Sequence, residues 1–146
     1  MTGTDSMTTT TAASPDVHRH GIPAESAFGY AQAIRSGDLV HVSGQLALDA
    51  SGTFAHTDDL PAQLALTYTN LDRVLGHYGA TRAQVVSQVV YVVDLHRYAD
   101  AVADGNRAYF GGHWPVSTVV GVAGLTFPGQ LVEISCVLDV RLPSGR

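Results

Sequence analysis

The sequence predicts a two-layer α+β domain in which two helices cover one face of a mixed β-sheet. Apolar side chains at helical spacing alternate with short runs rich in β-branched residues, in the order β-β-α-β-α-β-β. At 146 residues the chain is long enough to bury one core. No repeat or linker interrupts the pattern, so residues 21–146 are expected to form a single domain.

Residues 1–20 are expected to form a disordered tail. They are rich in Thr and Ser, show no hydrophobic period and contain almost no large apolar side chain. A segment of this kind buries too little surface to offset the entropy cost of ordering it. We expect His18 and His20, which lie in this tail, to be solvated rather than to bind a metal.

The first half of the domain reads as a hairpin followed by a helix. Residues 29–35 and 38–46 are predicted strands around a turn at Ser36 and Gly37. After a polar loop, residues 61–78 repeat apolar side chains at spacings of three and four. This stripe consists of Leu64, Tyr68, Leu71, Leu75 and Tyr78. Asp58 and Asp59 suit the N-terminus of such a helix, and Gly79 suits a left-handed C-terminal cap.

The second half alternates strand, helix and two further strands. The Val-rich run at 85–94 predicts a strand buried on both faces, and residues 95–110 predict a helix that Gly105 weakens. Residues 117–123 and 130–142 complete the sheet. No segment of the chain is left to cover the other face of the sheet, which favours an oligomer.

Composition narrows the classes of partner. Charged residues make up only 14% of the chain, so we expect part of the surface to be buried against other subunits. The net charge of −5 and eight scattered basic residues argue against a nucleic-acid partner. No apolar stretch is long enough to cross a membrane, and no hydrophobic signal core begins the chain, so a cytoplasmic protein is expected.

Glu133 is the residue most suggestive of chemistry. It is the only carboxylate in the apolar run 131–138, and an ionised carboxylate away from water is costly unless something binds it. Strand alternation places Val132, Ile134 and Cys136 on the face toward the helices and Glu133 on the other face. Glu133 is therefore either paired structurally or held for catalysis.

The second predicted strand carries a further candidate site. Alternation puts Leu39, His41, Ser43 and Gln45 on one face, and Gly44 allows a ligand to approach the backbone closely. The Ser43 hydroxyl and nearby N–H groups could bind a carboxylate or a developing oxyanion.

No cofactor or metal is expected. The sequence contains no phosphate-binding loop, dinucleotide glycine pattern, nucleophile elbow or metalloprotease motif. Outside the tail, its five histidines fall in five different predicted elements, so their spacing supplies no pair of metal ligands. Cys136, the only cysteine, excludes an internal disulfide and is expected to act as a small core hydrophobe.

Taken together, these segments resemble the reactive-intermediate deaminase (Rid, or YjgF-type) family from about residue 22 to 140. The matching stretches are Gly29-Tyr30-Ala31-Gln32-Ala33, Asp38-Leu39-Val40-His41-Val42-Ser43-Gly44-Gln45, Gln63, Asn70-Leu71, Val74-Leu75, Val92-Val93-Asp94-Leu95, Tyr109-Phe110, Pro115, Val122-Ala123-Gly124-Leu125 and Leu131-Val132-Glu133-Ile134. The resemblance implies a chorismate-mutase-like homotrimer with small-molecule clefts between its subunits.

The resemblance also implies a chemistry. Family members hydrolyse imines and enamines to a keto acid and ammonia without a cofactor. An Arg grips the substrate carboxylate, and a glutamate of the last strand positions the attacking water. Carried over to this sequence, the glutamate is Glu133, the tyrosine of the first strand is Tyr30, and the Ser-Gly pair is Ser43 and Gly44.

This sequence departs from the family where the substrate carboxylate is held. Pro115-Val116-Ser117-Thr118 stands in place of Pro-Ala-Arg-Ser, so the neutral Ser117 replaces the Arg, with Thr118 beside it. The asparagine of the family's second helix is also lost. Arg107 is a potential substitute for the Arg, and His113 and Trp114 are candidates for lining the altered cleft.

Two hypotheses follow. In the first, the chain is a Rid-like cleft enzyme with Glu133 as acid or base and a substrate other than 2-aminoacrylate, either an imine or enamine or an enol-like molecule. The reaction is hydrolysis, tautomerisation or cyclisation. In the second, the chain is a trimer that binds a small molecule or a partner without catalysis, and Glu133 only pairs with a neighbour.

Overall fold

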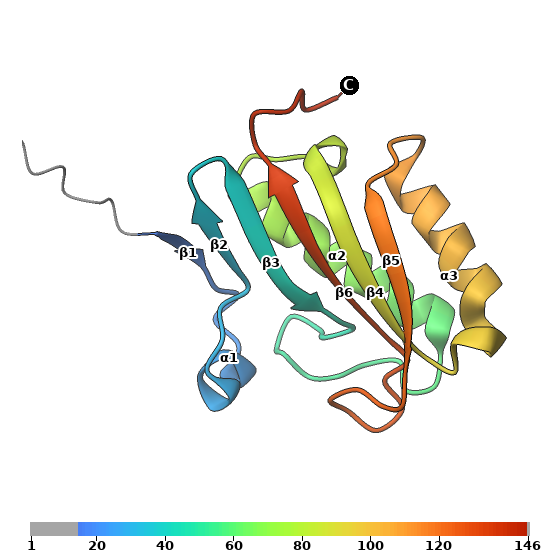
Figure 1. Cartoon of the computed structure of the whole chain (residues 1–146). Coiled ribbons are helices and arrows are strands. Elements are labelled where there is room, and N and C mark those ends of the chain that lie inside the picture. Colours follow the sequence, from blue (N-terminus) through green and yellow to red (C-terminus); the bar gives the residue numbers. More distant parts are fainter. Residues whose placement is uncertain (1–14, 146) are drawn as a thin grey trace, which may run out of the picture.

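The structure, a computed structural model that describes residues 15–145, confirms the α+β architecture. Six strands form one mixed sheet. The elements are β1 (Asp16–His18), α1 (Pro23–Phe28), β2 (Ala33–Ser36), β3 (Leu39–Gln45), α2 (Leu60–His77), a 3₁₀ turn η1 (Arg82–Gln84), β4 (Val85–Val93), α3 (Leu95–Phe110), β5 (Val116–Val122) and β6 (Val132–Asp139). In Figure 1 the long helix α2 lies behind the sheet and the long helix α3 lies beside the edge strand β5. The strand order is β1-β2-β3-β6-β4-β5, with β4 and β5 parallel and the other neighbours antiparallel.

Both long helices lie close to their predicted bounds. The Asp59 carboxylate accepts the Ala62 N–H at the start of α2, and Gly79 just beyond its end has a φ of 61°. Helix α3 spans the predicted residues 95–110. A Cβ on Gly105 would lie 2.3 Å from Cδ2 of Leu64, so the glycine that weakens α3 also lets it pack closely on α2.

The alternation along β6 is as predicted. Val132, Ile134, Cys136 and Leu138 are buried toward the helices, while the residues between them are partly exposed. The prediction that β4 is buried on both faces was wrong for the single chain. Its second face, at Val89 and elsewhere, is only partly covered, because no element of this chain packs on that side of the sheet.

Strand β3 departs from simple alternation. Val42 pairs with Cys136 and Gln45 pairs with Ile134, so three steps along β3 match two along β6. This β-bulge reverses the alternation. Gln45 is therefore only 2% exposed, which corrects its predicted place on the same face as His41 and Ser43.

The expected tail of residues 1–20 reaches too far into the chain. Residues 1–14 lie outside the described residues, but Asp16–His18 pair with β2 as an edge strand. Helix α1 follows, starting with Pro23, and ends at Gly29, whose φ is 70°. Strand β2 consequently begins at Ala33 and not at residue 29. We call residues 16–30 the strap.

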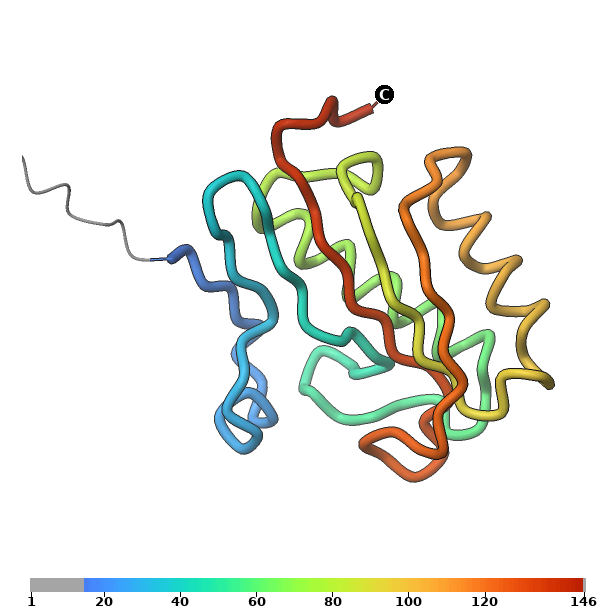
Figure 2. The backbone as a smooth tube through the Cα atoms, viewed as in Figure 1, coloured from blue at the N-terminus to red at the C-terminus, as the bar shows by residue number. Residues whose placement is uncertain are grey.

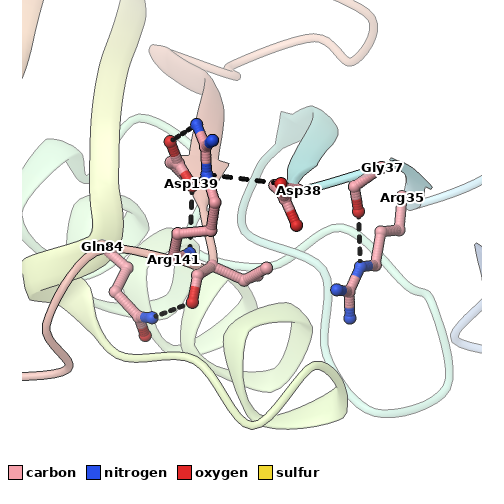
Figure 3. Close-up of polar contacts among 7 residues, drawn as sticks. Arg35, Gly37, Asp38, Gln84, Asp139 and Arg141 are labelled. Carbon is pink, nitrogen blue, oxygen red and sulfur yellow. Dashed lines mark hydrogen bonds and ion pairs between the residues drawn. The ribbon is translucent and has the colours of Figure 1, made fainter.

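Polar contacts close one end of the sheet (Figure 3). The Arg141 guanidinium donates to both carboxylate oxygens of Asp139 at 3.1 and 2.8 Å and lies 3.3 Å from Asp38. At the same end, Gln84 donates to the backbone oxygens of Val140 and Leu142. These contacts connect the β2–β3 turn to the end of β6. The candidate site lies at the opposite end of the sheet.

Candidate functional site

A cavity of about 310 Å³ lies at the end of the sheet where β3 ends and β6 begins. Figure 2 shows α1 of the strap and the loops 46–59 and 123–131 at this end of the sheet. The lining residues are Ala24, Phe28, Tyr30, Ser43, Gly44, Leu46, Leu48, Thr126, Phe127 and Glu133. The fold thus brings together Tyr30, Ser43, Gly44 and Glu133, which come from three separate predicted strands.

Glu133 is the acidic group of this cavity. Burial raises the pKa of its carboxyl, and a hydrogen bond that Gln130 Nε2 donates to Oε2 at 3.0 Å offsets only part of that rise. The other oxygen, Oε1, faces Gly44, where an added Cβ would lie 1.9 Å from it. Within the described chain no cationic partner of Glu133 is found. A carboxyl whose pKa is raised by burial is suited to both acid and base roles.

The bulge at Ser43 and Gly44 forms the wall opposite Glu133. The missing side chain of Gly44 leaves the room that the carboxylate occupies. The Ser43 hydroxyl donates to Ala31 O at 2.6 Å, so its hydrogen is already used. Ser43 therefore presents lone pairs to the cavity, and it can accept a hydrogen bond from a ligand N–H or O–H.

Tyr30 supplies a phenol from the end of the strap. Its pKa is raised above the usual value, first by burial and then by the charges of Glu25 and Glu133, while a contact with Gln32 acts in the opposite direction. Tyr30 is thus a neutral phenol at neutral pH. Arg19 Nη1 donates to the Tyr30 carbonyl oxygen at 2.8 Å and so helps to fix this end of the strap.

The remaining walls are mostly apolar. The ring of Phe127 stacks on Phe54 at 5.2 Å between centroids, which joins the two loops. Gln63 of α2 donates to Gly129 O at 2.7 Å and anchors the base of the second loop. Phe28 is 67% exposed at the cavity. Such walls suit a small ligand that is held by a few directed polar contacts.

The other predicted site residues do not line this cavity within one chain. Ser117 lies on β5, two strands from β6, and accepts a hydrogen bond from Gln88 Nε2 at 3.1 Å. With Arg107 it lines a separate hollow of about 440 Å³ between α3 and β5. Thr118 points to the open face of the sheet, opposite to Ser117.

His113 and Trp114 also lie away from the cavity. His113 Nε2 is 2.7 Å from Val85 O, so this nitrogen carries the proton and donates it to the carbonyl. Trp114 is 62% exposed just before the edge strand β5. Their predicted place in a ligand cleft requires a second subunit and stays a prediction.

Sequence reasoning missed a buried polar cluster behind the cavity. Its members are Glu25, Gln32 and Gln45, all of them nearly inaccessible to solvent. Glu25 carried no sequence signal, because it falls in a six-residue helix that no periodicity marks. Gln32 and Gln45 lie within the stretches of the family resemblance, but the bulge that buries Gln45 is not visible in the sequence.

Neither a metal centre nor a reactive thiol is found in the part of the chain that the structure describes. Within residues 15–145 no three His, Cys, Asp or Glu side chains are grouped so as to hold a metal ion. Burial raises the pKa of the Cys136 thiol to about 12, as expected for a core cysteine. None of the described helices combines the length and apolar character that a membrane span requires.

Comparison with known proteins agrees with the fold and covers the site. The family model described as Endoribonuclease L-PSP matches residues 22–140. The chain is similar to the RutC family protein YjgH of Escherichia coli K12 (32% identity over 108 residues, 73% of this chain and 79% of that protein). It is also similar to a 2-iminobutanoate/2-iminopropanoate deaminase of Dermatophagoides farinae (26% identity over 112 residues, 77% and 86%).

Among solved structures, a Mycobacterium tuberculosis member of the YjgF/YER057c/UK114 family superposes with a TM-score of 0.75 at 35% identity. The match covers 87% of this chain and 100% of that one.

Proposed function

Because the chain belongs to the endoribonuclease L-PSP family, which includes the YjgF or Rid proteins, we propose that it is a cleft enzyme with Glu133 as its acid/base group. Its substrate is a small imine, enamine or enol-like molecule. The observation that carries this proposal is the half-buried Glu133 carboxyl with its raised pKa, which faces the Gly44 bulge in a cavity shared with Tyr30 and Ser43. A carboxyl kept only for stability would instead be expected to have an ion-pair partner.

The geometry supports hydrolysis of a protonated imine. The Glu133 carboxylate takes a proton from water while the water oxygen bonds to the imine carbon, which gives a carbinolamine. The protonated Glu133 then returns this proton to the amine nitrogen. The C–N bond breaks, ammonia leaves, and the remaining hydroxyl loses its proton to solvent as the carbonyl forms. An enamine first tautomerises to the imine, a proton transfer that one acid/base group can also catalyse, and the imine then follows the same steps.

Ser43 and Tyr30 would hold the reacting molecule during these steps. The lone pairs of Ser43 accept from the substrate N–H, and the Tyr30 hydroxyl donates to a substrate oxygen. The sequence contains no lysine, and its basic residues are all Arg, so the proposed reaction uses water and not imine exchange onto a lysine.

We propose a substrate other than 2-aminoacrylate. No cation lines the cavity, and Ser117 is neutral and hydrogen-bonded to Gln88. A single hydroxyl does not replace the paired hydrogen bonds of a guanidinium to a carboxylate. In the proposed homotrimer, the hollow that carries Ser117 and Arg107 on one subunit meets the cavity of the next, and His113, Trp114 and Thr118 lie near that boundary.

The alternative is a non-catalytic trimer that binds a small molecule or a partner. The family name, endoribonuclease L-PSP, refers to RNA cleavage, but the eight scattered Arg residues and the net charge of −5 make RNA a poor partner.

Ammonia release from freshly generated 2-imino acids tests the proposal. The assay compares the wild type with Glu133→Gln and Ser117→Arg and includes a panel of neutral imines and a single-stranded RNA. We expect slow turnover of 2-imino acids, faster turnover of a neutral imine, and loss of both in Glu133→Gln. Ser117→Arg should raise the rate with 2-imino acids. An activity that survives Glu133→Gln would remove Glu133 from the mechanism, and inert wild-type protein would favour the binding trimer.

A further inference from the structure

Glu25 is a buried carboxylate that the proposed reaction does not use. It lies in α1 behind the cavity and is only 4% exposed. Burial alone would raise its pKa, but three N–H donors outweigh burial and leave the pKa below the usual value. These donors are the backbone N–H groups of His20 at 2.6 Å and Gly21 at 3.0 Å, and Gln32 Nε2 at 2.9 Å. Glu25 is therefore ionised at neutral pH and can only accept hydrogen bonds.

An acceptor at this position fixes the orientation of the Gln32 amide. Gln32 Nε2 must face the Glu25 carboxylate, because the amide oxygen would be repelled there. The amide oxygen of Gln32 then faces Gln45 Nε2, which donates to it at 2.9 Å. Gln45 Nε2 is also 3.1 Å from the Ser43 carbonyl oxygen in the bulge. The chain of contacts thus runs from the strap to the wall of the cavity: Gln32 donates to Glu25, and Gln45 donates both to Gln32 and to Ser43.

The second hydrogen of Gln32 Nε2 is directed to Tyr30. The distance from Gln32 Nε2 to the Tyr30 hydroxyl oxygen is 3.4 Å, a long hydrogen bond. Because the tyrosine oxygen receives a hydrogen on this side, its own proton is free to point into the cavity.

We propose that Glu25 is a positioning residue which, through Gln32, makes Tyr30 a hydrogen-bond donor to the ligand. The inference deepens the proposed function and rests on it for the identity of the reaction. It also narrows the ligand to molecules that present an oxygen or nitrogen lone pair to Tyr30 while presenting an N–H or O–H to Ser43.

The variant Glu25→Gln tests whether Glu25 sets the direction of the hydrogen bond between Gln32 and Tyr30. Its one side-chain oxygen keeps the Gly21 N–H, while the new NH₂ group takes the place of Oε1, so the contact with the His20 N–H is lost. Its new NH₂ group faces Gln32, whose amide must turn over and present its oxygen to both position 25 and Tyr30. The Tyr30 hydroxyl then donates to Gln32 and is lost as a donor to the cavity.

The first readout needs neither ligand nor activity. Protein labelled with 3-fluorotyrosine is titrated by ¹⁹F NMR, with the Tyr30 signal assigned by Tyr30→Phe; fluorination makes the phenol acidic enough to titrate before the protein denatures. We expect the Tyr30 pKa to rise in Glu25→Gln, because the phenolate would face the oxygen of Gln32. Removal of the Glu25 charge alone would lower it. A lowered or unchanged pKa would therefore overturn the proposal.

Asp49→Asn is the matched control for a change of charge near the cavity. Asp49 accepts hydrogen bonds from Ser51 and Thr53, and none of the hydrogen bonds of Gln32 in the described chain involves it. We expect no rise of the Tyr30 pKa in this variant, and a rise as large as that in Glu25→Gln would contradict the role assigned to Gln32.

The second readout is the rate with the best imine substrate. We expect Glu25→Gln to lower kcat/KM about tenfold or more, and Glu25→Gln combined with Tyr30→Phe to be no slower than Tyr30→Phe alone. If the two substitutions lower kcat/KM by independent factors that multiply in the double variant, Glu25 acts without Tyr30. If the wild type turns over no substrate, the proposed function fails, and the NMR titration still decides the role of Glu25.

Discussion

At the scale of single residues, Gly44 has the most direct effect on the site. Its Cα faces Oε1 of Glu133, and a methyl group there would overlap the carboxylate. We expect Gly44→Ala to push Glu133 out of position and to lower kcat/KM about 100-fold, as misplacement of a reacting group by about 1 Å does.

Gly124→Ala is the control for this prediction, measured in the same ammonia-release assay. Gly124 lies in a loop that borders the cavity, no atom lies within 4 Å of its added Cβ, and its backbone does not need a positive φ. Equal losses of activity in the two variants would argue against the close contact as the cause.

Glu133 should also lower the stability of the fold at neutral pH. Its folded-state pKa is raised by burial, so the folded protein binds a proton more readily than the unfolded chain. The contribution of Glu133 is most favourable below its unfolded pKa and is lost as the pH rises through the folded pKa. We expect Glu133→Gln to melt at a higher temperature than the wild type at pH 7 and at the same temperature below pH about 4. Equal melting temperatures at pH 7 would mean that the carboxyl is well solvated.

The residues of the site were predictable only where simple alternation holds. Glu133 could be placed on the open face because β6 has no bulge, and the positions of Val132 and Ile134 confirm it. Gln45 could not be placed, because an extra residue in β3 depends on pairing with a distant strand. Glu25 could not be found because its importance comes from three donors that only the folded strap brings together.

At the scale of elements, the contact between α2 and α3 depends on Gly105. Ala has a higher helix propensity than Gly by about 1 kcal/mol, but a methyl group at 105 would overlap the buried Leu64. Overpacking of this kind costs about 1–3 kcal/mol. We therefore expect Gly105→Ala to lower the free energy of unfolding, as measured by urea denaturation.

The matched control lies in the other helix. Gly76 of α2 has no atom within 4 Å of an added Cβ, so Gly76→Ala should stabilise the protein by about 0.5–1 kcal/mol. Stabilisation by both variants would show that Leu64 moves aside freely.

The strap should loosen in acid. The rings of His18 and His77 stack at 4.1 Å, and Nε2 of both His18 and His20 is buried without a partner. Burial is the main reason that the pKa of each is lowered, to about 4 for His20, and Arg73 adds to the effect. The other groups that act on this pair are Asp16, Glu25 and His77.

The sign of this pH dependence follows from the direction of the shifts. Between pH about 4 and 6.5 the detached strap binds protons that the packed strap does not, so packing is strongest above pH 6.5 and weakens as the pH falls. We expect the Val17 amide to exchange faster in acid than its intrinsic rate predicts, measured by NMR hydrogen exchange. The Val42 amide in β3 is the internal control, and parallel behaviour of the two would point to global unfolding.

Elements with a long periodic pattern were predictable, and short ones were not. The bounds of α3 match the prediction because sixteen residues carry enough periodicity to define both ends. The edge strand β1 has three residues and α1 has six, and both are held by contacts with the rest of the strap and with β2. Their order therefore comes from tertiary contacts and not from local sequence.

At the scale of the whole molecule, the open face of the sheet should be an interface between subunits. Val116 and Val120 lie on this face of the edge strand β5 and are 75% and 36% exposed. We expect analytical ultracentrifugation to give about three times the chain mass of 15.4 kDa. Val116→Asp combined with Val120→Asp should shift the protein to monomers, because a buried interface does not tolerate two unpaired charges.

Ala65→Asp, on the exposed side of α2, should leave the mass unchanged. A wild-type monomer at micromolar concentration would contradict the proposed trimer, and with it a cleft shared between subunits.

The bulge in β3 has a consequence for anyone who redesigns this strand. The bulge shifts the alternation of the strand by one residue. From Leu39 to Val42, even-numbered positions point to the core, whereas after the bulge the odd-numbered Gln45 points to it. A library that varies the odd-numbered positions of β3 would therefore alter the open face before the bulge and the core at Gln45. The face of each position in β3 therefore has to be assigned separately on the two sides of the bulge.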